Sequence, residues 1–498
     1  MDRRTSPSAS SDSGTDLPEH RPSQNPRTGS PAPGGKVLAL GAAFVRTVRH
    51  VCPQLDRWLD SLPDSRFQPF VVYDKRFLFW WGLLLFVCKL GSRRQLDYEL
   101  RDLETQVLDN VNRLAGTEQQ TLPVHKTLDH FLGHVGAAGV AAVRSQCIQR
   151  LLRMRVLDAG RLQGKPVAAL DGSGFLVFGQ RHCPYCLTMK TQAGTVYLHP
   201  VWECKLVDPR GLALSIGTEF IENPLPVEAS ATEGASSVAD YDEKNKQDCE
   251  LKGWSRLAAE LKAQFAHTPW CISGDSLYAC GPAIAICQQH GWSFVFTFKE
   301  GRTPALWADF QGLLELSPEN RLRMRLADGT EQRYRWVNEL DYRDSDGRAH
   351  CLNAVLCEET RAGETTTYAW ITDLRVNAHT VIDIAEKGGR IRSKIENEGF
   401  NLQKNSGLNL EHAYSFGTEQ MQCFYLLLQL AHLFLQLFEK GSLLRRLASE
   451  YGGGVAKVFG SLKNLGRRLL ECLRYFSLPS EAFDPTAAAG CQIRLDDS

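Results

Sequence analysis

The sequence predicts an α/β protein in which a region of alternating strands and helices is preceded and followed by helices. Over residues 37–157, apolar residues recur at three- and four-residue steps, the period of amphipathic helices. Over residues 166–301, short apolar strands alternate with helices, the pattern of an α/β sheet. Over residues 302–366, alternation at every second residue replaces the helical period and predicts a β-rich insertion.

The individual elements follow in order along the chain. Residues 1–36 are rich in Ser, Pro, Gly, Arg and Asp and nearly free of large apolar side chains, which predicts a disordered tail. After the helical region, VAALDGS and FLVFGQ are predicted to form a hairpin, and TVYLHPVWECKLV a third strand. The strand TTYAWITDL leads into a long helical stretch. The predicted divisions are 1–36 (tail), 37–160 (helical), 161–301 with 367–415 (α/β), 302–366 (β-rich insertion), 416–478 (C-terminal helices) and 479–498 (tail).

Charge, cysteine content and hydropathy indicate where charged surfaces lie along the chain and where in the cell the protein is located. The 57 basic and 57 acidic residues balance overall, but residues 144–165 carry six basic and one acidic residue. Residues 215–250 carry nine acidic and two basic residues, and residues 440–474 eight basic and two acidic ones. The 15 cysteines have no recurring spacing, and the chain starts without a secretory signal, so we expect a cytoplasmic protein. The apolar runs at 77–88 and 421–438 are too short or too polar for membrane spans and predict buried helices.

Three acidic residues carry the chemistry that the sequence predicts. Asp171 follows the apolar strand VAAL, and Asp275 follows WCISG. Glu396 lies in a helix expected to pass the same edge of the sheet, where open α/β sheets bind ligands. Converging carboxylates repel one another unless a cation neutralises them, so together they predict a site for two Mg²⁺ (or Mn²⁺) ions roughly 4 Å apart. The alternative for each acid is an ordinary turn or cap residue.

Three sequence blocks resemble the motifs of DDE transposases encoded by bacterial insertion sequences. They are DGSGF around Asp171, GDSLYACGP around Asp275, and RIRSKIENEGFNLQKNSGLNLEH around Glu396. The resemblance covers about residues 80–438. It implies a ribonuclease H-like catalytic domain, Mg²⁺-dependent cleavage of double-stranded DNA at transposon ends, transfer of 3′-OH ends to target DNA, a homodimer on DNA, and a location at the bacterial nucleoid.

The third block also implies phosphate-binding residues. In the family, Tyr, Arg and Lys at fixed steps around the Glu contact terminal phosphates. Here Arg392 matches, whereas Gly389 stands at the Tyr position, Gln403 stands at the Lys position, and Lys404 is one place off. The cationic candidates for DNA binding are Arg390, Arg392, Lys394, Lys404 and Lys299. For the lysines, a solvated helix face with internal ion pairs is the alternative.

A cluster of cysteines and histidines gives a second candidate metal site. Cys183, Cys186, His199 and Cys204 follow the spacing C-x2-C-x12-H-x4-C, which resembles a zinc site. His199 and Cys204 are five residues apart on a predicted strand and thus point to opposite faces, so Cys183, Cys186 and His199 are the expected Zn²⁺ ligands. A hairpin tip with free thiols is the alternative.

Trp307 and Trp336 fall in the β-rich insertion. The resemblance implies that an aromatic residue of that region can stack on a flipped base, while core packing is the ordinary role of such a residue.

Three functions fit these features. The first is a transposase with Asp171, Asp275 and Glu396 as catalytic residues. The second is a transposase-derived repressor without activity, and the third is a metal-dependent nuclease without strand transfer. Because all three acids are present, the sequence favours an enzyme.

Overall fold

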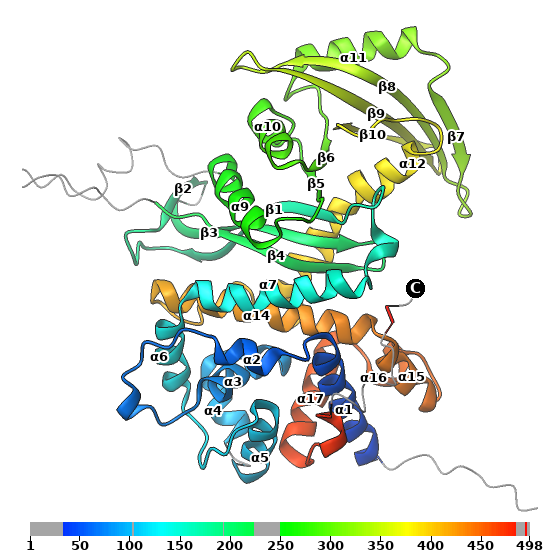
Figure 1. Ribbon diagram of the computed structural model, residues 1–498. Coiled ribbons are helices and arrows are strands. Elements are labelled where there is room, and N and C mark those ends of the chain that lie inside the picture. The colour runs from blue at the N-terminus through cyan, green and yellow to red at the C-terminus, as the bar shows by residue number, and fades with distance from the viewer. Residues whose placement is uncertain (1–32, 102–103, 193, 224–249, 485–493, 496–498) are drawn as a thin grey trace, which may run out of the picture.

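Figure 1 shows the computed structural model of the chain, which describes residues 33–101, 104–192, 194–223, 250–484 and 494–495. Over these residues the protein has the predicted mixed α/β structure, with a ten-stranded sheet that contains parallel and antiparallel pairs. Most of the predicted tail at 1–36, residues 224–249 of the acidic segment, and most of the chain after 484 lie outside the described residues.

Helices form the region before the sheet. The first begins at Pro33, four residues before the expected start at 37. In α3, Asp74 accepts a hydrogen bond from the backbone N–H of Arg76 at the N-cap, and every residue from Phe77 to Val87 is buried. Such a helix is apolar all round and lies at the centre of its layer. The helices are α1 (Pro33–Val51), α2 (Leu55–Asp60), α3 (Lys75–Val87), α4 (Arg93–Leu100), α5 (Glu104–Ala115), α6 (His125–Val135) and α7 (Ala137–Met154).

The sheet is arranged around β1 (Val167–Phe178), which pairs antiparallel with β3 and parallel with β5. The predicted hairpin of VAALDGS and FLVFGQ is wrong, because both segments belong to this one strand. Residues 172–174 stay extended and pair with β3, and only a bulge between Gly174 and Leu176 interrupts the ladder. The other elements of this half are β2 (Leu187–Thr191), β3 (Gly194–Asp208), β4 (Leu212–Phe220), α9 (Glu250–Gln264), β5 (Cys271–Gly274), α10 (Gly281–His290) and β6 (Ser293–Thr297).

The predicted β-rich insertion extends the same sheet, because β10 pairs with β6. Its first part differs from the prediction: Pro304–Leu316 forms helix α11. A proline in the first turn favours this helix, and Leu306, Phe310 and Leu314 recur at four-residue steps and are buried. The strands are β7 (Arg321–Arg325), β8 (Glu331–Arg343), β9 (Ala349–Arg361) and β10 (Glu364–Thr372).

The stretch after β10 is helical, as predicted, but irregular. It contacts β1, β5 and β6, and the Ser273 hydroxyl of β5 donates a 2.5 Å hydrogen bond to the Gly388 carbonyl. Two of its segments are π-helical, a form that is frequent at functional sites. The segments are α12 (Val381–Asp383), the π-helix η3 (Ile384–Gly389), the 3-10 turn η4 (Arg390–Arg392), the π-helix η5 (Ile395–Asn401) and α13 (Leu402–Asn405).

Helix α14 (Thr418–Lys440) connects the two halves of the molecule. It runs beside α7, contacts α3 and α6, and also contacts β4 of the sheet (Figure 1). By length and composition it is the one described helix that could cross a membrane, yet 94% of its most apolar stretch is buried inside the protein. A core helix of a soluble protein has these properties. The helices that follow, α15 (Ser442–Glu450), α16 (Val455–Phe459) and α17 (Leu462–Tyr475), return to the N-terminal helices, where α17 packs on α1 and α5.

A buried polar network lies where α7, the sheet and α14 meet. Glu203 and Lys205 of β3 are fully buried, and their carboxylate oxygen and ammonium nitrogen are 3.2 Å apart. The Thr218 hydroxyl of β4 donates to Glu203, and the guanidinium of buried Arg144 donates to Thr218. The Lys205 ammonium donates to the Gln429 side-chain oxygen of α14 at 2.6 Å. These bonds connect α7, two strands and α14 through charged groups that have no access to water.

The network continues into the helical stretch at α13. The Gln403 side-chain nitrogen donates to the Gln429 oxygen at 2.8 Å and to the His432 ring at 2.9 Å. The Gln436 nitrogen donates to the same His432 Nδ1 at 3.1 Å. Burial lowers the pKa of His432, so that its ring is neutral and can accept these hydrogen bonds.

Replacing Lys205 tests how much this network contributes to the free energy of unfolding. We expect Lys205→Ala to lower the free energy of unfolding by about 3–5 kcal/mol, because it leaves the Glu203 carboxylate buried without its partner. Arg467→Ala, which removes a surface pair with Glu471, is the matched control and should change it by less than about 1 kcal/mol. Urea unfolding followed by circular dichroism measures both, and equal effects of the two substitutions would contradict the role given to the buried pair.

Candidate functional site

Two of the predicted acids lie side by side on adjacent parallel strands. β1 and β5 pair through Ala169 and Ser273, and Asp171 and Asp275 each lie two residues further along the chain. Asp171 is inside β1 and not at its end, whereas Asp275 follows the last residue of β5 directly. Backbone N–H groups orient both carboxylates: that of Gly172 donates to Asp171 at 3.0 Å, and that of Leu277 donates to Asp275 at 2.9 Å.

Glu396 comes to the same place from the helical stretch. It lies on η5, which contacts β1, and its side chain is 51% exposed. Arg392, one turn earlier, links two of the acids: its guanidinium is 2.7 Å from a Glu396 oxygen and 3.5 Å from an Asp171 oxygen. The sequence identified Arg392 only as a phosphate ligand, and its contacts with both acids could not be read from spacing.

The electrostatics of Asp171 follow from this arrangement. Burial is the largest influence and raises the pKa of Asp171 to about 7. The neighbouring Arg392 opposes this shift, while the negative charges of Glu396 and Asp275 add to it. All three predicted acids are therefore close enough to interact.

The donor set fits hard divalent cations, which prefer carboxylate oxygens. Asp171, Asp275 and Glu396 could hold such ions, and a bound cation would remove the repulsion that contributes to the raised pKa of Asp171. Arg392 is a positively charged group beside Asp171 and Glu396.

The other cationic candidates have different positions. Arg390 lies 2.8 Å from Glu359 and 3.1 Å from Glu386, with its guanidinium over the Tyr368 ring, so it joins the helical stretch to the insertion. Lys394 pairs with Glu398 at 2.7 Å, and Lys404 pairs with Glu411 at 2.9 Å. Lys299 is exposed, just beyond β6. Lys394 and Lys404 thus form the internal ion pairs that the sequence analysis gave as the alternative to DNA binding.

The structure gives reasons for the residues at Gly389 and Gln403, the two positions that differ from the motif of the resemblance. At Gly389, a Cβ atom would lie 2.3 Å from the Trp370 indole, so a tyrosine does not fit unless Trp370 moves. Gln403 is fully buried in the polar network with Gln429 and His432, where a lysine would have to be desolvated. Gly389 and Gln403 thus pack the helical stretch against the sheet and α14.

Gly172, next to Asp171, lies against a tryptophan of β3. The Trp202 indole is only 2.1 Å from where a Cβ of residue 172 would lie, so no larger residue fits there unless Trp202 moves. A cavity of about 500 Å³ is lined by Gly172, Trp202 and Leu277, among others, and none of the three acids lines it.

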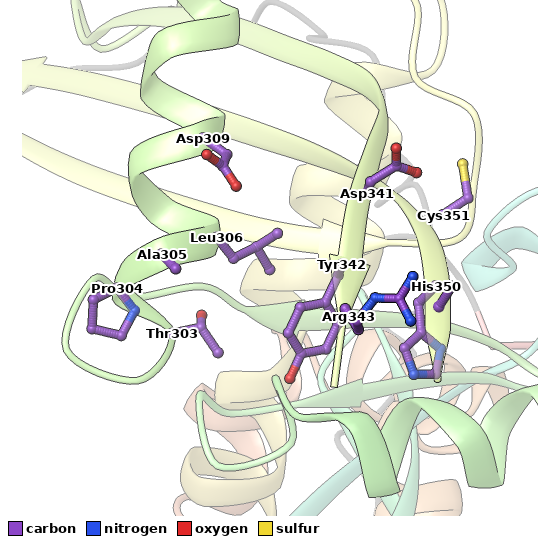
Figure 2. Close-up of a pocket in the computed structure, with 11 residues that line it drawn as sticks. Thr303, Pro304, Ala305, Leu306, Asp309, Asp341, Tyr342, Arg343, His350 and Cys351 are labelled. Atoms are coloured by element: carbon purple, nitrogen blue, oxygen red, sulfur yellow. The ribbon is translucent and has the colours of Figure 1, made fainter. Parts of the chain in front are cut away.

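A second cavity, of about 710 Å³, lies in the insertion (Figure 2). It is formed between α11 and the strands β8 and β9, and Asp309, Tyr342 and His350 are among its lining residues. None of the three predicted acids lines it. Trp307 is outside its lining and packs on Phe298 with ring centroids 4.9 Å apart, and Trp336 is only 4% exposed. Trp336 is thus a core residue and Trp307 is half-buried, and base stacking by either stays a prediction.

The cysteine and histidine cluster is real, but its membership differs from the sequence pattern. The structure brings Cys183, Cys186 and His199 together, as expected, and adds His182 as the fourth residue. Cys204 is outside the cluster, buried between β1 and β4. His182 directly precedes Cys183, so the sequence itself offered it as a ligand. The prediction followed the zinc-like spacing that ends at Cys204 and left His182 out.

Comparison with known proteins adds no family. A scan against protein-family models gives no match for this chain, and a search of curated proteins gives none either.

The raised pKa of Asp171 predicts how pH affects the metal-free protein. The folded protein holds a proton on Asp171 up to a pH of about 7, whereas in the unfolded chain the carboxyl has its ordinary pKa of 3.8. Stability therefore falls as the pH rises through this window. Asp171→Asn cannot ionise, so we expect it to exceed wild type in free energy of unfolding by on the order of 2 kcal/mol at pH 8, and by less at pH 5.

Urea unfolding in EDTA at both pH values measures this difference. Asp309→Asn, which changes an exposed acid of α11, is the control and should behave as wild type at both. A difference between Asp171→Asn and wild type that does not change with pH would contradict the raised pKa.

Proposed function

We propose that the protein is a DNA transposase that cleaves phosphodiester bonds at the ends of its own element and transfers the 3′-OH ends to target DNA. The observation that carries the proposal is the convergence of Asp171, Asp275 and Glu396 from β1, the end of β5 and η5. These are the residues at the three motif positions, and they come from segments separated by more than 100 residues of sequence.

The strand arrangement supports a ribonuclease H-like catalytic fold. Strands β1, β3 and β4 form an antiparallel unit, and β5 and β6 follow in parallel with β1. Helix α9 connects β4 to β5, and α10 connects β5 to β6. In such a fold the first strand, the fourth strand and a late helix supply the acids. With β2 counted as an addition, β1, β5 and η5 would take these positions.

Each residue has a definite task in this proposal. Asp171, Asp275 and Glu396 would hold two Mg²⁺ or Mn²⁺ ions. When bound, such ions activate a water or a 3′-OH and stabilise the leaving oxygen. Arg392 lies at the acids and is placed to contact a phosphate, and exposed Lys299 is a further phosphate candidate.

DNA binding would also use the basic segments, although not every residue in them. Arg144 is buried in the polar network, and Arg155 and Arg161 pair with Asp158 at 2.8 and 2.7 Å. In the C-terminal segment, Arg467 is 77% exposed. Contacts of exposed arginines and lysines with phosphates would make binding weaken steeply as salt concentration rises.

A cleavage assay tests the proposal directly. DNA on either side of the gene is searched for inverted repeats bracketed by short direct repeats, and a fragment carrying these repeats serves as substrate with Mg²⁺. We expect wild type to nick the ends and join them to a plasmid. Asp171→Asn and Glu396→Gln should lower cleavage at least about 10³-fold, because each removes a metal ligand, while gel-shift binding of the ends is retained.

Asp309→Asn is the matched control, since it removes an acid that lies outside the site, and it should cleave as wild type does. The other outcomes separate the alternatives. Cleavage without joined products indicates a nuclease, and end binding without cleavage by wild type indicates a repressor. Loss of end binding in Asp171→Asn would make this residue structural.

A further inference from the structure

Four side chains gather at the base of the hairpin formed by β2 and β3. His182, Cys183 and Cys186 come from the loop between β1 and β2, and His199 comes from β3. One nitrogen or sulfur atom from each lies within 4.8 Å of the others. The sulfurs of Cys183 and Cys186 are 3.5 Å apart, and each is 3.3 Å from Nε2 of His199. Nδ1 of His182 is 3.3 Å from the Cys186 sulfur.

Four of the six distances between these ligand atoms, 3.3–3.5 Å, are close to the edges of a zinc coordination tetrahedron. Zn²⁺ binds thiolate sulfur at about 2.3 Å and imidazole nitrogen at about 2.0–2.1 Å. A tetrahedron with these bond lengths has edges of roughly 3.3–3.8 Å. We propose that His182, Cys183, Cys186 and His199 bind one Zn²⁺ as a Cys₂His₂ site. Four protein ligands leave no open position, so the site is structural and not catalytic.

The surroundings hold the ligands in place. The turn Cys183–Cys186 is fixed by Asn223, whose backbone N–H donates to the Tyr185 carbonyl at 3.1 Å and whose side chain donates to the Cys186 carbonyl at 3.0 Å. Cys186 and His199 are buried, which keeps competing water away. Two sulfur and two nitrogen ligands select Zn²⁺ over Mg²⁺ or Mn²⁺, so this site and the carboxylate site differ in the ion they take.

The hairpin explains what the ion contributes. β2 is the edge strand of the sheet, and its residues are half-buried or exposed along the whole strand, so few apolar contacts hold it in place. An ion held by the β1–β2 loop and by β3 fixes the base of this hairpin. His199 pairs with Leu176, five residues beyond Asp171, so the ion lies roughly 16 Å from the carboxylate site along β1. Its role does not depend on the proposed function.

Cys204 provides the matched control. It belongs to the zinc-like spacing in the sequence, but it pairs in register with Leu170 of β1 and Gly217 of β4 and is fully buried there. If the structure gives the ligands correctly, removing its sulfur leaves the ion in place, whereas removing His182 does not.

The experiment measures metal in the full-length protein, purified from zinc-supplemented cells, by mass spectrometry. We expect roughly one Zn²⁺ per chain in wild type and in Cys204→Ala, and a loss of at least about fivefold in His182→Ala and Cys186→Ser. X-ray absorption at the zinc edge should give two sulfur and two nitrogen neighbours. Wild type without zinc, or zinc lost in Cys204→Ala but kept in His182→Ala, would overturn the proposal.

A second measurement applies if a ligand variant does not fold. Metal-stripped wild type is titrated with Co²⁺, and a tetrahedral site with two thiolates should produce visible absorption bands that one equivalent of Zn²⁺ abolishes. Absence of these bands in a protein with wild-type circular dichroism would contradict the site. Neither measurement uses DNA cleavage, so the outcome is independent of the transposase assay.

Discussion

The buried pair of Glu203 and Lys205 is the constraint on which the arrangement of the molecule depends. Two charges without access to water are tolerable only when every neighbour is in place to satisfy them. On the Glu203 side, Thr218 of β4 donates to the carboxylate and Arg144 of α7 donates to Thr218. On the Lys205 side, the ammonium donates to Gln429 of α14. The helical layer, the sheet and the long core helix are thus fixed relative to one another by a polar contact whose geometry is far stricter than that of apolar packing.

The position of Glu396 follows from the same constraint. Gly399, three residues after it, lies against the Lys205 side chain, where a Cβ would be 3.2 Å away, and Gln403 is part of the network. The two ends of the segment that carries Glu396 are therefore anchored: Gly388 accepts a hydrogen bond from β5, and Gln403 binds α14. Between these anchors the chain takes π and 3-10 turns instead of a regular helix, which sets the direction in which Glu396 points.

Period and composition were sufficient to predict the α/β class, the helical regions on both sides of the sheet, and the β-rich segment. They could not show that Gly172–Gly174 continue β1, because glycines in that pattern indicate a turn as readily as a strand. The prediction also missed α11, although a proline in its first turn and Leu306, Phe310 and Leu314 at four-residue steps are visible in the sequence. At the site, the sequence located Asp171, Asp275 and Glu396, but the pairing of Arg392 with two of them and the inclusion of His182 in the cluster depend on contacts between distant segments.

Arg392 also links the structure to the proposed chemistry. Its guanidinium lies 3.5 Å from Asp171 and 2.7 Å from Glu396, the same carboxylates that would hold the ions. Under the proposed function, bound cations replace this positive charge, so the guanidinium no longer has the acids as its partners. A DNA phosphate, which can accept two hydrogen bonds from one guanidinium, is the partner then best suited to it. Under the proposed function, metal binding and phosphate binding would thus be coupled through Arg392, because both act on the charge balance of the same carboxylates.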